Sequence, residues 1–572
     1  MAMGRNDTMT GPRQILARLA AMGVSEWVVA TGARNLPLVR ELMAAGDACL
    51  WHGFEERSCG FFALGRIQGG AGPVAVVTTS GTAVAELLPA VIEAFYEGLP
   101  LVVVSADRPP EFRGSGAPQA IEQAGLLAGH CGWTADLWED GRAVSGGGPF
   151  AWPESLPWNR PAHLNVCLGE PQAAAPERWR LGDWQPGAGV PTAQGGRGDA
   201  LEVDDEGDGE LEREVGRFLG SDRPTLALVA GLDRDDERRA VSGWLERIGL
   251  PAIWERSSGW GRQGWRDRSG GGLVQVAGGP GHERWLQQVE AGQVLRLGTV
   301  PSWRWWRDLE DRSGVDVLSL SRSGHRGLGR REGCRGRPVD LARLARWRRR
   351  PGVCPVQLPD DPWRDRLGSA WGQFPASEPG LLAALDRAMG DGAVMFVGNS
   401  LPIREWNLVA GGAGRGRSCH AARGANGIDG QLSQGLGVGA RASESWVVVG
   451  DLTALYDLSA PFWLEQLRPP GRARRCRLVV VNNGGGRIFS RLPAFAGLGE
   501  AQRRVTENRH SARFADWAAM WGLAHVRVSD PAGLAPDRVR AWPDEVVVEL
   551  VPDEDQTRAF WDWWQAEAGT GR

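Results

Sequence analysis

The last third of the chain places oxygen-bearing side chains at the ends of two apolar runs. Asp451 follows SWVVVG, and Asn482 and Asn483 end RLVVVNN, directly before three glycines. In an open parallel sheet, ligands bind at the carboxyl ends of the strands, so both segments are expected at one edge of a sheet. Mg²⁺ takes hard oxygen ligands and shares them with phosphates and water, and a glycine-rich turn lets backbone groups approach a phosphate. A lone Gly-Asp starts many loops, but the pairing of two strand ends predicts a magnesium–phosphate site.

The composition excludes several other chemistries. The sequence contains no lysine, so all 65 basic residues are arginines. Schiff-base chemistry through lysine, including pyridoxal-phosphate catalysis, is therefore excluded, as is a P-loop with its lysine. Anionic substrates must be held by arginine, whose planar guanidinium matches carboxylates.

The remaining bulk features are those of a soluble globular protein. The net charge is −4, and the eight cysteines and eight histidines are scattered without metal-ligand spacing. They are expected to be reduced cysteines and ordinary histidines, without a zinc or iron site. Neither a signal-peptide core nor an apolar run of transmembrane length is present, so a cytoplasmic protein without membrane or nucleic-acid partners is expected.

Three blocks of alternating strands and helices are expected to position these residues. The first block has apolar runs at 26–30, 73–78, 100–105 and 162–168, with helical patterns at 56–68 and 82–97. Weaker alternation follows in PTLALVAGL, PAIWE, QVLRLGT and VDVLSL, and strong alternation returns in AVMFVGNS, SWVVVGD, RLVVVNN and DEVVVEL. Apolar runs alternating with helices are typical of an α/β fold with parallel sheets. The predicted divisions are a domain over 1–185, a Gly/Pro-rich linker over 186–210, and domains over 211–355 and 356–572.

The segments around Asp451 and Asn483 resemble the diphosphate–magnesium motif of thiamine-diphosphate enzymes. Leu452 stands where that motif usually has glycine, and GDLTALYDL resembles one branch of the family, the 2-succinyl-5-enolpyruvyl-6-hydroxy-3-cyclohexene-1-carboxylate synthases of menaquinone and phylloquinone biosynthesis. The branch is also matched by FVGNSLPIREW (396–406), RGANGIDGQLS (423–433), NNGGGRIFS (482–490), SGTAVAELLPAVIEA (80–94) and SADRPPE (105–111). The resemblance implies a thiamine-diphosphate-binding fold with pyrimidine-binding, central and diphosphate-binding domains in this order.

The resemblance also assigns a catalytic glutamate to HGFEERSCGFFALG. Thiamine catalysis needs a glutamate hydrogen-bonded to the aminopyrimidine ring, in a water-poor pocket that raises its proton affinity. The family pattern places this residue directly before arginine, which selects Glu56, whereas Glu55 is expected to favour the helix dipole. The implied contacts with thiamine diphosphate are Glu56, Asn399, Ser400, Gly424, Ile428, Gly450, Asp451, Leu452, Thr453, Asn483, Gly485, Gly486 and Ile488. The implied ligands of Mg²⁺ (or Mn²⁺) are Asp451, Asn483 and Gly485.

The reaction implied by the resemblance joins 2-oxoglutarate, with decarboxylation, to isochorismate. Both substrates carry several carboxylates, for which arginines are expected. The implied substrate contacts are Arg34, Arg108, Gln119, Arg304, Ser400, Arg404, Arg423, Ile488 and Phe489. Ala33, Pro118 and Arg487 depart from the residues that are usual in the family at their positions, which are a serine, an asparagine and a polar amide.

The family assembles its active site between subunits, so the resemblance implies a homodimer or homotetramer in which Glu56 acts in trans. Three alternatives remain open. An acetohydroxyacid synthase or 2-oxo acid decarboxylase would use the same cofactor. A nucleotide-binding oxidoreductase is suggested by GLGVGARA (435–442), although these glycines precede a strand instead of following one. A nucleic-acid-binding protein is suggested by the basic stretch 322–350, which otherwise reads as a solvated loop and exposed helix.

Overall fold

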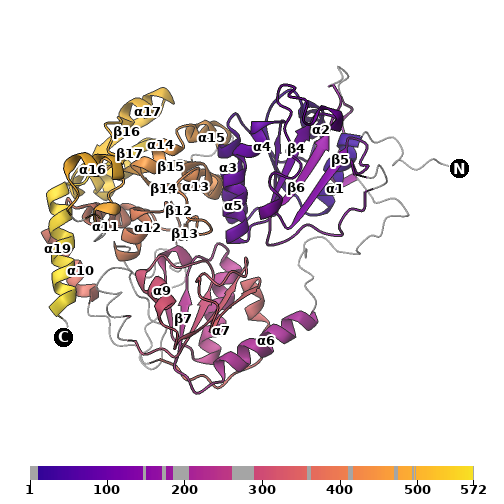
Figure 1. The fold of residues 1–572 in the computed structure, drawn as a ribbon. Coiled ribbons are helices and arrows are strands. Elements are labelled where there is room, and N and C mark those ends of the chain that lie inside the picture. The colour runs from indigo at the N-terminus through magenta and orange to yellow at the C-terminus, as the bar shows by residue number, and fades with distance from the viewer. Residues whose placement is uncertain are drawn as a thin grey trace. The chain divides into compact units, whose positions relative to one another are not determined.

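A computed structural model of the chain describes residues 11–145, 150–170, 176–183, 205–259, 286, 289–356, 363–409, 417–468, 474–491, 495 and 497–570. The chain divides into two compact units, Met1–Asp205 and Glu206–Arg572. The first unit contains one parallel sheet and the second contains two (Figure 1). The predicted α/β class with parallel sheets is therefore confirmed. Most of the predicted linker lies outside the described residues, and its last part, 205–210, belongs to a helix.

The sheet of the first unit has six strands in the order β2-β1-β3-β4-β6-β5. Its strands are β1 (Glu26–Ala30), β2 (Leu50–Gly53), β3 (Val74–Thr78), β4 (Leu101–Asp107), β5 (Trp133–Trp138) and β6 (Ala162–Cys167), and its helices are α1 (Gly11–Ala21), α2 (Leu36–Ala44), α3 (Glu56–Gln68), α4 (Thr82–Glu86) and α5 (Leu88–Glu97). The four central strands are buried along their whole length, which explains their continuous apolar runs. Alternate residues of these strands, such as Trp27 and Val29, share a core with α1 and α2.

The single helix predicted over 82–97 is wrong, because the structure has two helices with a break at Leu87. Pro89 lies in the first turn of α5 and has no N–H to continue the hydrogen bonding of α4. Pro is tolerated in a first helical turn, where its N–H would have no partner in any case. Proline therefore starts a new helix at this point.

The first sheet of the second unit has five strands in the order β11-β10-β9-β7-β8. Its strands are β7 (Thr225–Val229), β8 (Ala252–Trp254), β9 (Gln293–Leu297), β10 (Asp316–Ser321) and β11 (Cys334–Pro338), with helices α6 (Asp205–Leu219), α7 (Asp235–Ile248) and α9 (Arg304–Asp308). One face packs against α6 and α7, and the tryptophans of the α9 segment pack against the other.

The basic stretch 322–350 is only partly the loop that its composition predicted. It contains β11, which pairs with β10 in parallel. Its arginines meet acids of this unit: Arg322 lies 2.9 Å from Glu237, Arg337 2.8 Å from Glu214, and Arg343 2.8 Å from Asp208. These acids compensate part of the positive charge, which weakens the nucleic-acid alternative.

The last sheet has six strands in the order β13-β12-β14-β15-β17-β16. Its strands are β12 (Val394–Val397), β13 (Ser418–His420), β14 (Glu444–Gly450), β15 (Arg475–Val481), β16 (Ala524–Val528) and β17 (Glu545–Leu550). Its helices are α10 (Trp363–Gln373), α11 (Glu378–Ala388), α12 (Leu401–Val409), α13 (Gln431–Val438), α14 (Asp451–Tyr456), α15 (Trp463–Gln466), α16 (Glu500–Thr506), α17 (Phe514–Met520), α18 (Pro536–Arg540) and α19 (Glu554–Thr570). The glycines of GLGVGARA lie in α13 and the turn after it, ahead of β14, so the context of a dinucleotide-binding turn is missing.

Two further expectations can be compared with the described residues. The eight cysteines are all free, as predicted. Within the described ranges, no helix has both the length and the apolar character that a membrane crossing requires.

Candidate active site

Asp451 lies where β14 ends and α14 begins, next to the end of β15 in the sheet. The residue is 2% exposed. The Oδ2 atom accepts hydrogen bonds from the backbone N–H groups of Gly484 (2.8 Å) and Gly485 (2.9 Å), and Oδ1 accepts one from Leu452 (2.6 Å). The two strand ends predicted to share a site are therefore in direct contact. Burial raises the pKa of Asp451, and this effect exceeds the lowering by the charge of nearby His510.

Asn483 supplies the observation that tests whether a metal fits here. Its Nδ2 donates to Glu378 Oε2 (3.0 Å), while its Oδ1 is buried without a hydrogen-bond partner. Such an oxygen is costly unless something binds it. A carboxylate has about four acceptor positions, so Asp451 Oδ1, with one hydrogen bond, can still bind a cation. These two side chains are the hard oxygen donors that Mg²⁺ prefers, and they fit the implied metal.

Close packing requires a glycine at position 485 in the turn after Asn483. Gly485 has φ +143°, and a Cβ atom there would lie 2.6 Å from the backbone oxygen of Glu507. The same oxygen accepts a hydrogen bond from the N–H of Gly486 (2.5 Å). The turn is thereby fixed against segment 507–510, which also brings His510 Nε2 to 3.2 Å from Asp451 Oδ2. Neither Glu507 nor His510 was predicted, because no local pattern in the sequence links them to the motif.

Among the described residues, no group of three or more His, Cys, Asp or Glu side chains could hold a metal ion. The candidate ligand set, one carboxylate with amide and backbone oxygens, is of a different kind and suits a cation that is shared with phosphate and water.

The carboxyl end of β12 carries the next predicted residues. Asn399 is buried, and both ends of its amide are bonded, with Oδ1 accepting from Arg423 Nη1 (3.0 Å) and Nδ2 donating to the Gly427 carbonyl (2.8 Å). Ser400 has φ +72°, and its carbonyl accepts from Arg404 Nη1 (2.5 Å). The structure thus brings Asn399 and Arg423 together, and Ser400 and Arg404 together.

The other predicted cofactor contacts lie on neighbouring segments. Ile428 is half-buried in the turn before α13, and Gly424 lies in the same 423–430 segment. Gly450 is the residue before α14, and Thr453 is buried within that helix. Ile488 is half-buried after the glycine turn, Phe489 is 39% exposed, and a Cβ atom on Gly486 would lie 3.5 Å from both Leu452 and Phe489. Leu452 and Phe489 therefore flank the glycine turn.

Glu55 and Glu56 have different environments in the first unit. Glu55 precedes α3, and its carboxylate accepts hydrogen bonds from the N–H groups of Arg57 (3.0 Å) and Ser58 (3.1 Å), as expected of a capping residue. Glu56 is the first residue of α3 and is half-buried. Burial raises its pKa, and the nearby charges of Glu55 and Glu86 raise it further. A glutamate with raised proton affinity is what the predicted role of Glu56 requires.

Arg34 uses its guanidinium inside the first unit. It is 8% exposed, and it donates to the carbonyls of Leu168 (3.2 Å) and Gly169 (2.9 Å) and to Glu170 Oε1 (2.9 Å). The guanidinium therefore ties the loop after β1 to the end of β6. Its predicted contact with a substrate is not tested by this arrangement.

A buried polar network supports the loop that carries Arg108 and Gln119. Gln123 accepts from the N–H of Gly81 (2.9 Å) and donates to the Ala106 carbonyl (3.0 Å) and to Asn165 Oδ1 (2.9 Å). Asn165 in turn donates to Asp107 (3.0 Å) and Asp136 (2.8 Å), which both bind Arg113.

Within this loop, Arg108 Nε donates to the Pro118 carbonyl (3.0 Å), and exposed Gln119 has φ +58°. The backbone at Gly81 has φ +83°, and a Cβ atom there would lie 3.1 Å from Gln119 Cα. The loop that contains Gln119 therefore packs directly on the turn at residues 80–82.

Arg304, the predicted contribution of the middle of the chain, is the first residue of α9. Its side chain is 65% exposed, and its Nε bonds Asp308 Oδ1 (2.8 Å) one turn further along. Two residues earlier, Ser302 is bonded to buried Glu255. The Arg304 guanidinium thus reaches solvent from a well-anchored segment.

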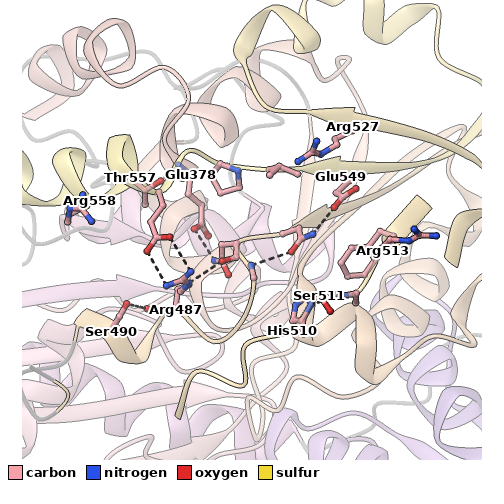
Figure 2. A pocket seen from close by; sticks show the side chains of 18 of the residues that line it. Glu378, Arg487, Ser490, His510, Ser511, Arg513, Arg527, Glu549, Thr557 and Arg558 are labelled. Carbon is pink, nitrogen blue, oxygen red and sulfur yellow. Dashed lines mark hydrogen bonds and ion pairs between the residues drawn. The ribbon is translucent and has the colours of Figure 1, made fainter. Parts of the chain in front are cut away.

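A cavity of about 920 Å³ opens beside the glycine turn (Figure 2). Asn483, Gly484 and His510 line one part of it, and its other lining residues include members of β16, β17, α19 and the segment 511–515. Arg487 also lines it, and this departure from the family pattern is explained by two acids, Glu507 (3.4 Å) and Glu554 (3.2 Å), that pair with its guanidinium. The cavity gives the buried oxygen of Asn483 a neighbouring space in which a ligand could lie.

Comparison with known proteins identifies the family. Residues 9–126 match the family described as thiamine pyrophosphate enzyme, N-terminal TPP binding domain. A protein of Akkermansia muciniphila is 36% identical over 96% of this chain and 98% of its own length, and one of Bdellovibrio bacteriovorus is 34% identical over 96% and 97%. A third, from Halorhodospira halophila, is 30% identical over 92% and 91%. All three are named 2-succinyl-5-enolpyruvyl-6-hydroxy-3-cyclohexene-1-carboxylate synthase. The chain is thus a thiamine-diphosphate enzyme, and it belongs to the family of 2-succinyl-5-enolpyruvyl-6-hydroxy-3-cyclohexene-1-carboxylate synthases.

Proposed function

We propose that the chain joins 2-oxoglutarate, with loss of carbon dioxide, to isochorismate and forms 2-succinyl-5-enolpyruvyl-6-hydroxy-3-cyclohexene-1-carboxylate. The observation that carries this proposal is the contact between Asp451 and the glycine turn after Asn483, in a chain that matches synthases of this name over almost its whole length. We assign the pyrimidine-binding, central and diphosphate-binding domains to 1–185, 211–355 and 356–572, with 186–210 as a linker.

Thiamine diphosphate, when bound, supplies a ring that accepts the electrons released on decarboxylation. Asp451, Asn483 and a backbone oxygen of Gly485 would hold Mg²⁺ (or Mn²⁺) against its diphosphate. Asn399, Ser400, Gly424, Ile428, Gly450, Leu452, Thr453, Gly486 and Ile488 would line the cofactor. This assignment is supported by the unpartnered oxygen of Asn483 and by the burial of Asp451.

Glu56 would hold the proton that the aminopyrimidine ring exchanges. Its raised pKa supports this role, because a carboxyl that keeps its proton more readily is a better donor near neutral pH. Arg34, Arg108, Arg304, Arg404 and Arg423, with Gln119, Ser400, Ile488 and Phe489, would hold the two acids in register. Fixed guanidinium groups around charged substrates act through proximity and electrostatics.

The direct test is turnover of purified chain with thiamine diphosphate, Mg²⁺, 2-oxoglutarate and isochorismate. Product formation that requires both acids supports the proposal, and turnover of pyruvate alone would favour an acetohydroxyacid synthase or 2-oxo acid decarboxylase. The matched variant is Glu56→Gln, which keeps the shape of the side chain and is expected to lower kcat by about 100- to 10,000-fold. A Glu56→Gln variant with full activity would refute the assignment of Glu56.

We further propose that the active form is a homodimer or homotetramer in the cytoplasm, in which Glu56 acts on cofactor held by a partner subunit. Mixing the inactive variants Glu56→Gln and Asp451→Asn tests this arrangement. Hybrid dimers would contain one site with both native residues, so activity should return on mixing. An in-cis site would leave every hybrid inactive, whatever the oligomer measured by sedimentation.

A further inference from the structure

Glu255 is a buried acid of the second unit that none of the assignments above uses. It follows β8 and is 1% exposed. Its Oε1 accepts hydrogen bonds from the N–H of Ser302 (2.7 Å), from Asn407 Nδ2 (3.0 Å) and from the hydroxyl of Ser302, and its Oε2 accepts from Ser257 Oγ (2.9 Å). A buried carboxylate is tolerated only with such dense hydrogen bonding.

The donors to Glu255 come from segments far apart in the sequence. Ser302 lies in the loop after β9, in the middle of the chain, whereas Asn407 lies in α12 of the last sheet. Asn407 closes the network, because its Nδ2 also donates to Ser302 Oγ (2.9 Å) and its Oδ1 accepts from the N–H of Arg256 (2.8 Å). Glu255 therefore joins the two sheet domains of the second unit through hydrogen bonds that water cannot easily replace.

The two segments that Glu255 joins each carry one of the candidate substrate arginines. Ser302 precedes Arg304 by two positions, and Asn407 lies one helical turn after Arg404 in α12. Both segments follow the carboxyl ends of parallel strands, where ligands bind in such sheets. Arg304 and Arg404 are exposed residues, whereas their neighbours in both segments are mostly buried.

A second contact holds the same loop. Arg423 donates to the Val300 carbonyl through Nε (3.4 Å) and Nη2 (3.3 Å), and its Nη1 binds Asn399 at the end of β12. The loop from Val300 to Ser302 is thus attached at two points to the last domain. Two attachments restrict rotation as well as translation of the loop, which one contact could not do.

We propose that Glu255 is a positioning residue that holds the Arg304 and Arg404 segments at a fixed separation for binding a polyanionic substrate. The inference rests on the proposed function, in which both arginines bind carboxylates. Displacing a binding group by about 1 Å can lower the rate about 100-fold. Loss of this network should therefore impair substrate binding and turnover while leaving cofactor binding at Asp451 unchanged.

Three variants test the proposal in the full chain. Glu255→Ala removes the shared acceptor. Asn407→Ala removes the hydrogen bonds from α12 to Glu255, Ser302 and Arg256 and leaves Glu255 in place, which keeps the test available if Glu255→Ala fails to fold. Glu255→Gln should keep the network intact. Its amide oxygen can accept hydrogen bonds from Ser302 and Asn407, and the Ser257 hydroxyl can turn to accept one from the amide NH₂ group. The matched control is Asp386→Asn, which weakens another buried pair of the last domain, with Arg417 (2.7 Å).

The measurements are the KM of each acid, the thermal shift caused by thiamine diphosphate with Mg²⁺, and hydrogen exchange of segments 298–304 and 401–409. We expect Glu255→Ala and Asn407→Ala to raise the KM of at least one acid about ten-fold or more, with faster exchange in both segments and an unchanged cofactor-induced shift. Glu255→Gln and Asp386→Asn should keep wild-type KM values.

The outcome separates the two proposals. Unchanged KM values in folded Glu255→Ala, or an equal rise in Asp386→Asn, would overturn the positioning role. If the wild-type chain does not turn over the two acids, the proposed function fails, and hydrogen exchange alone then decides the role of Glu255. Slow exchange in both segments of Glu255→Ala would overturn it in that case as well.

Discussion

Replacing Asp451 with asparagine tests the cofactor grip directly. In the structure, the carboxylate accepts three backbone N–H groups and lies 3.2 Å from His510. Asparagine has one acceptor oxygen, so it can keep the bonds from Gly484 and Gly485 and lose the bond from Leu452. Loss of one hydrogen bond to a charged group costs about 1.5–3 kcal/mol. The raised pKa of Asp451 means that burial of its charge opposes folding near neutral pH, and the neutral amide removes that effect, so the two changes oppose each other in the free chain.

The larger effect is expected on binding of thiamine diphosphate with Mg²⁺. A ligand present at 100 times its Kd stabilises the folded chain by about 2.7 kcal/mol. Loss of a residue that only supports a metal ligand lowers metal affinity by up to about 100-fold. Loss of a ligand itself should lower the affinity by at least as much, so about 100-fold is a low estimate for Asp451→Asn. The ligand would then be at its Kd, and the stabilisation falls to about 0.4 kcal/mol. The lost 2.3 kcal/mol corresponds to about 5–9 °C of thermal shift for a cooperative unit of 150–250 residues.

The assay is intrinsic-fluorescence melting with and without thiamine diphosphate and Mg²⁺, for which the 28 tryptophans provide the signal. Asp386→Asn is the control, because it weakens a buried ion pair in the same domain, at the amino end of β13 and not at a carboxyl end of the sheet. It should lower the melting temperature of the free chain and keep the full cofactor-induced shift. A full shift in Asp451→Asn would refute the reasoning that this carboxylate holds the metal.

Three further predictions concern the first unit. Burial raises the pKa of Glu56 above its ordinary value of 4.5. Its protonated carboxyl therefore favours the folded state at low pH, and this contribution is lost as pH rises through the raised pKa. Glu56→Gln should melt at a higher temperature than wild type at pH 8 but not at pH 4. Gly81→Ala should lower the free energy of unfolding by about 1–3 kcal/mol, because the backbone at this position has φ +83°. It should also raise the KM of a substrate by displacing Gln119; thermal melting measures the first effect and steady-state kinetics the second. Burial lowers the pKa of His163 from 6.5 to about 4, so the free energy of unfolding should fall by up to about 3 kcal/mol as pH drops from 6.5 to 4. His163→Gln should lose this part of the acid sensitivity, as urea unfolding at pH 4 and pH 7 would measure. Equal pH dependence in His163→Gln and wild type would contradict the last of these.

The sequence was sufficient to predict the central strands and the position of the cofactor grip. Strands such as β1, β3 and β4 are buried on both faces, which produces the continuous apolar runs from which they were predicted. Because β14 and β15 are neighbours in the sheet, the residues after them meet as expected. The strands that were not predicted include β2, β5, β13 and β16, which lie at sheet edges and are short or half-exposed. Their mixed composition does not distinguish them from loops.

The arginines show where local motifs stop being informative. A motif can identify the position of an arginine, but the use of its five N–H donors depends on which carbonyls lie nearby in the folded chain. Arg34 and Arg423 are buried and donate to backbone carbonyls at the ends of other strands, whereas Arg304 is mostly exposed. A lysine could not replace either buried residue, because three donors on one nitrogen cannot span acceptors on separate segments as a planar guanidinium does. In a chain without lysine, the same residue type therefore builds the frame of the candidate site and supplies its exposed cations. The distinction between these two roles is visible only in three dimensions.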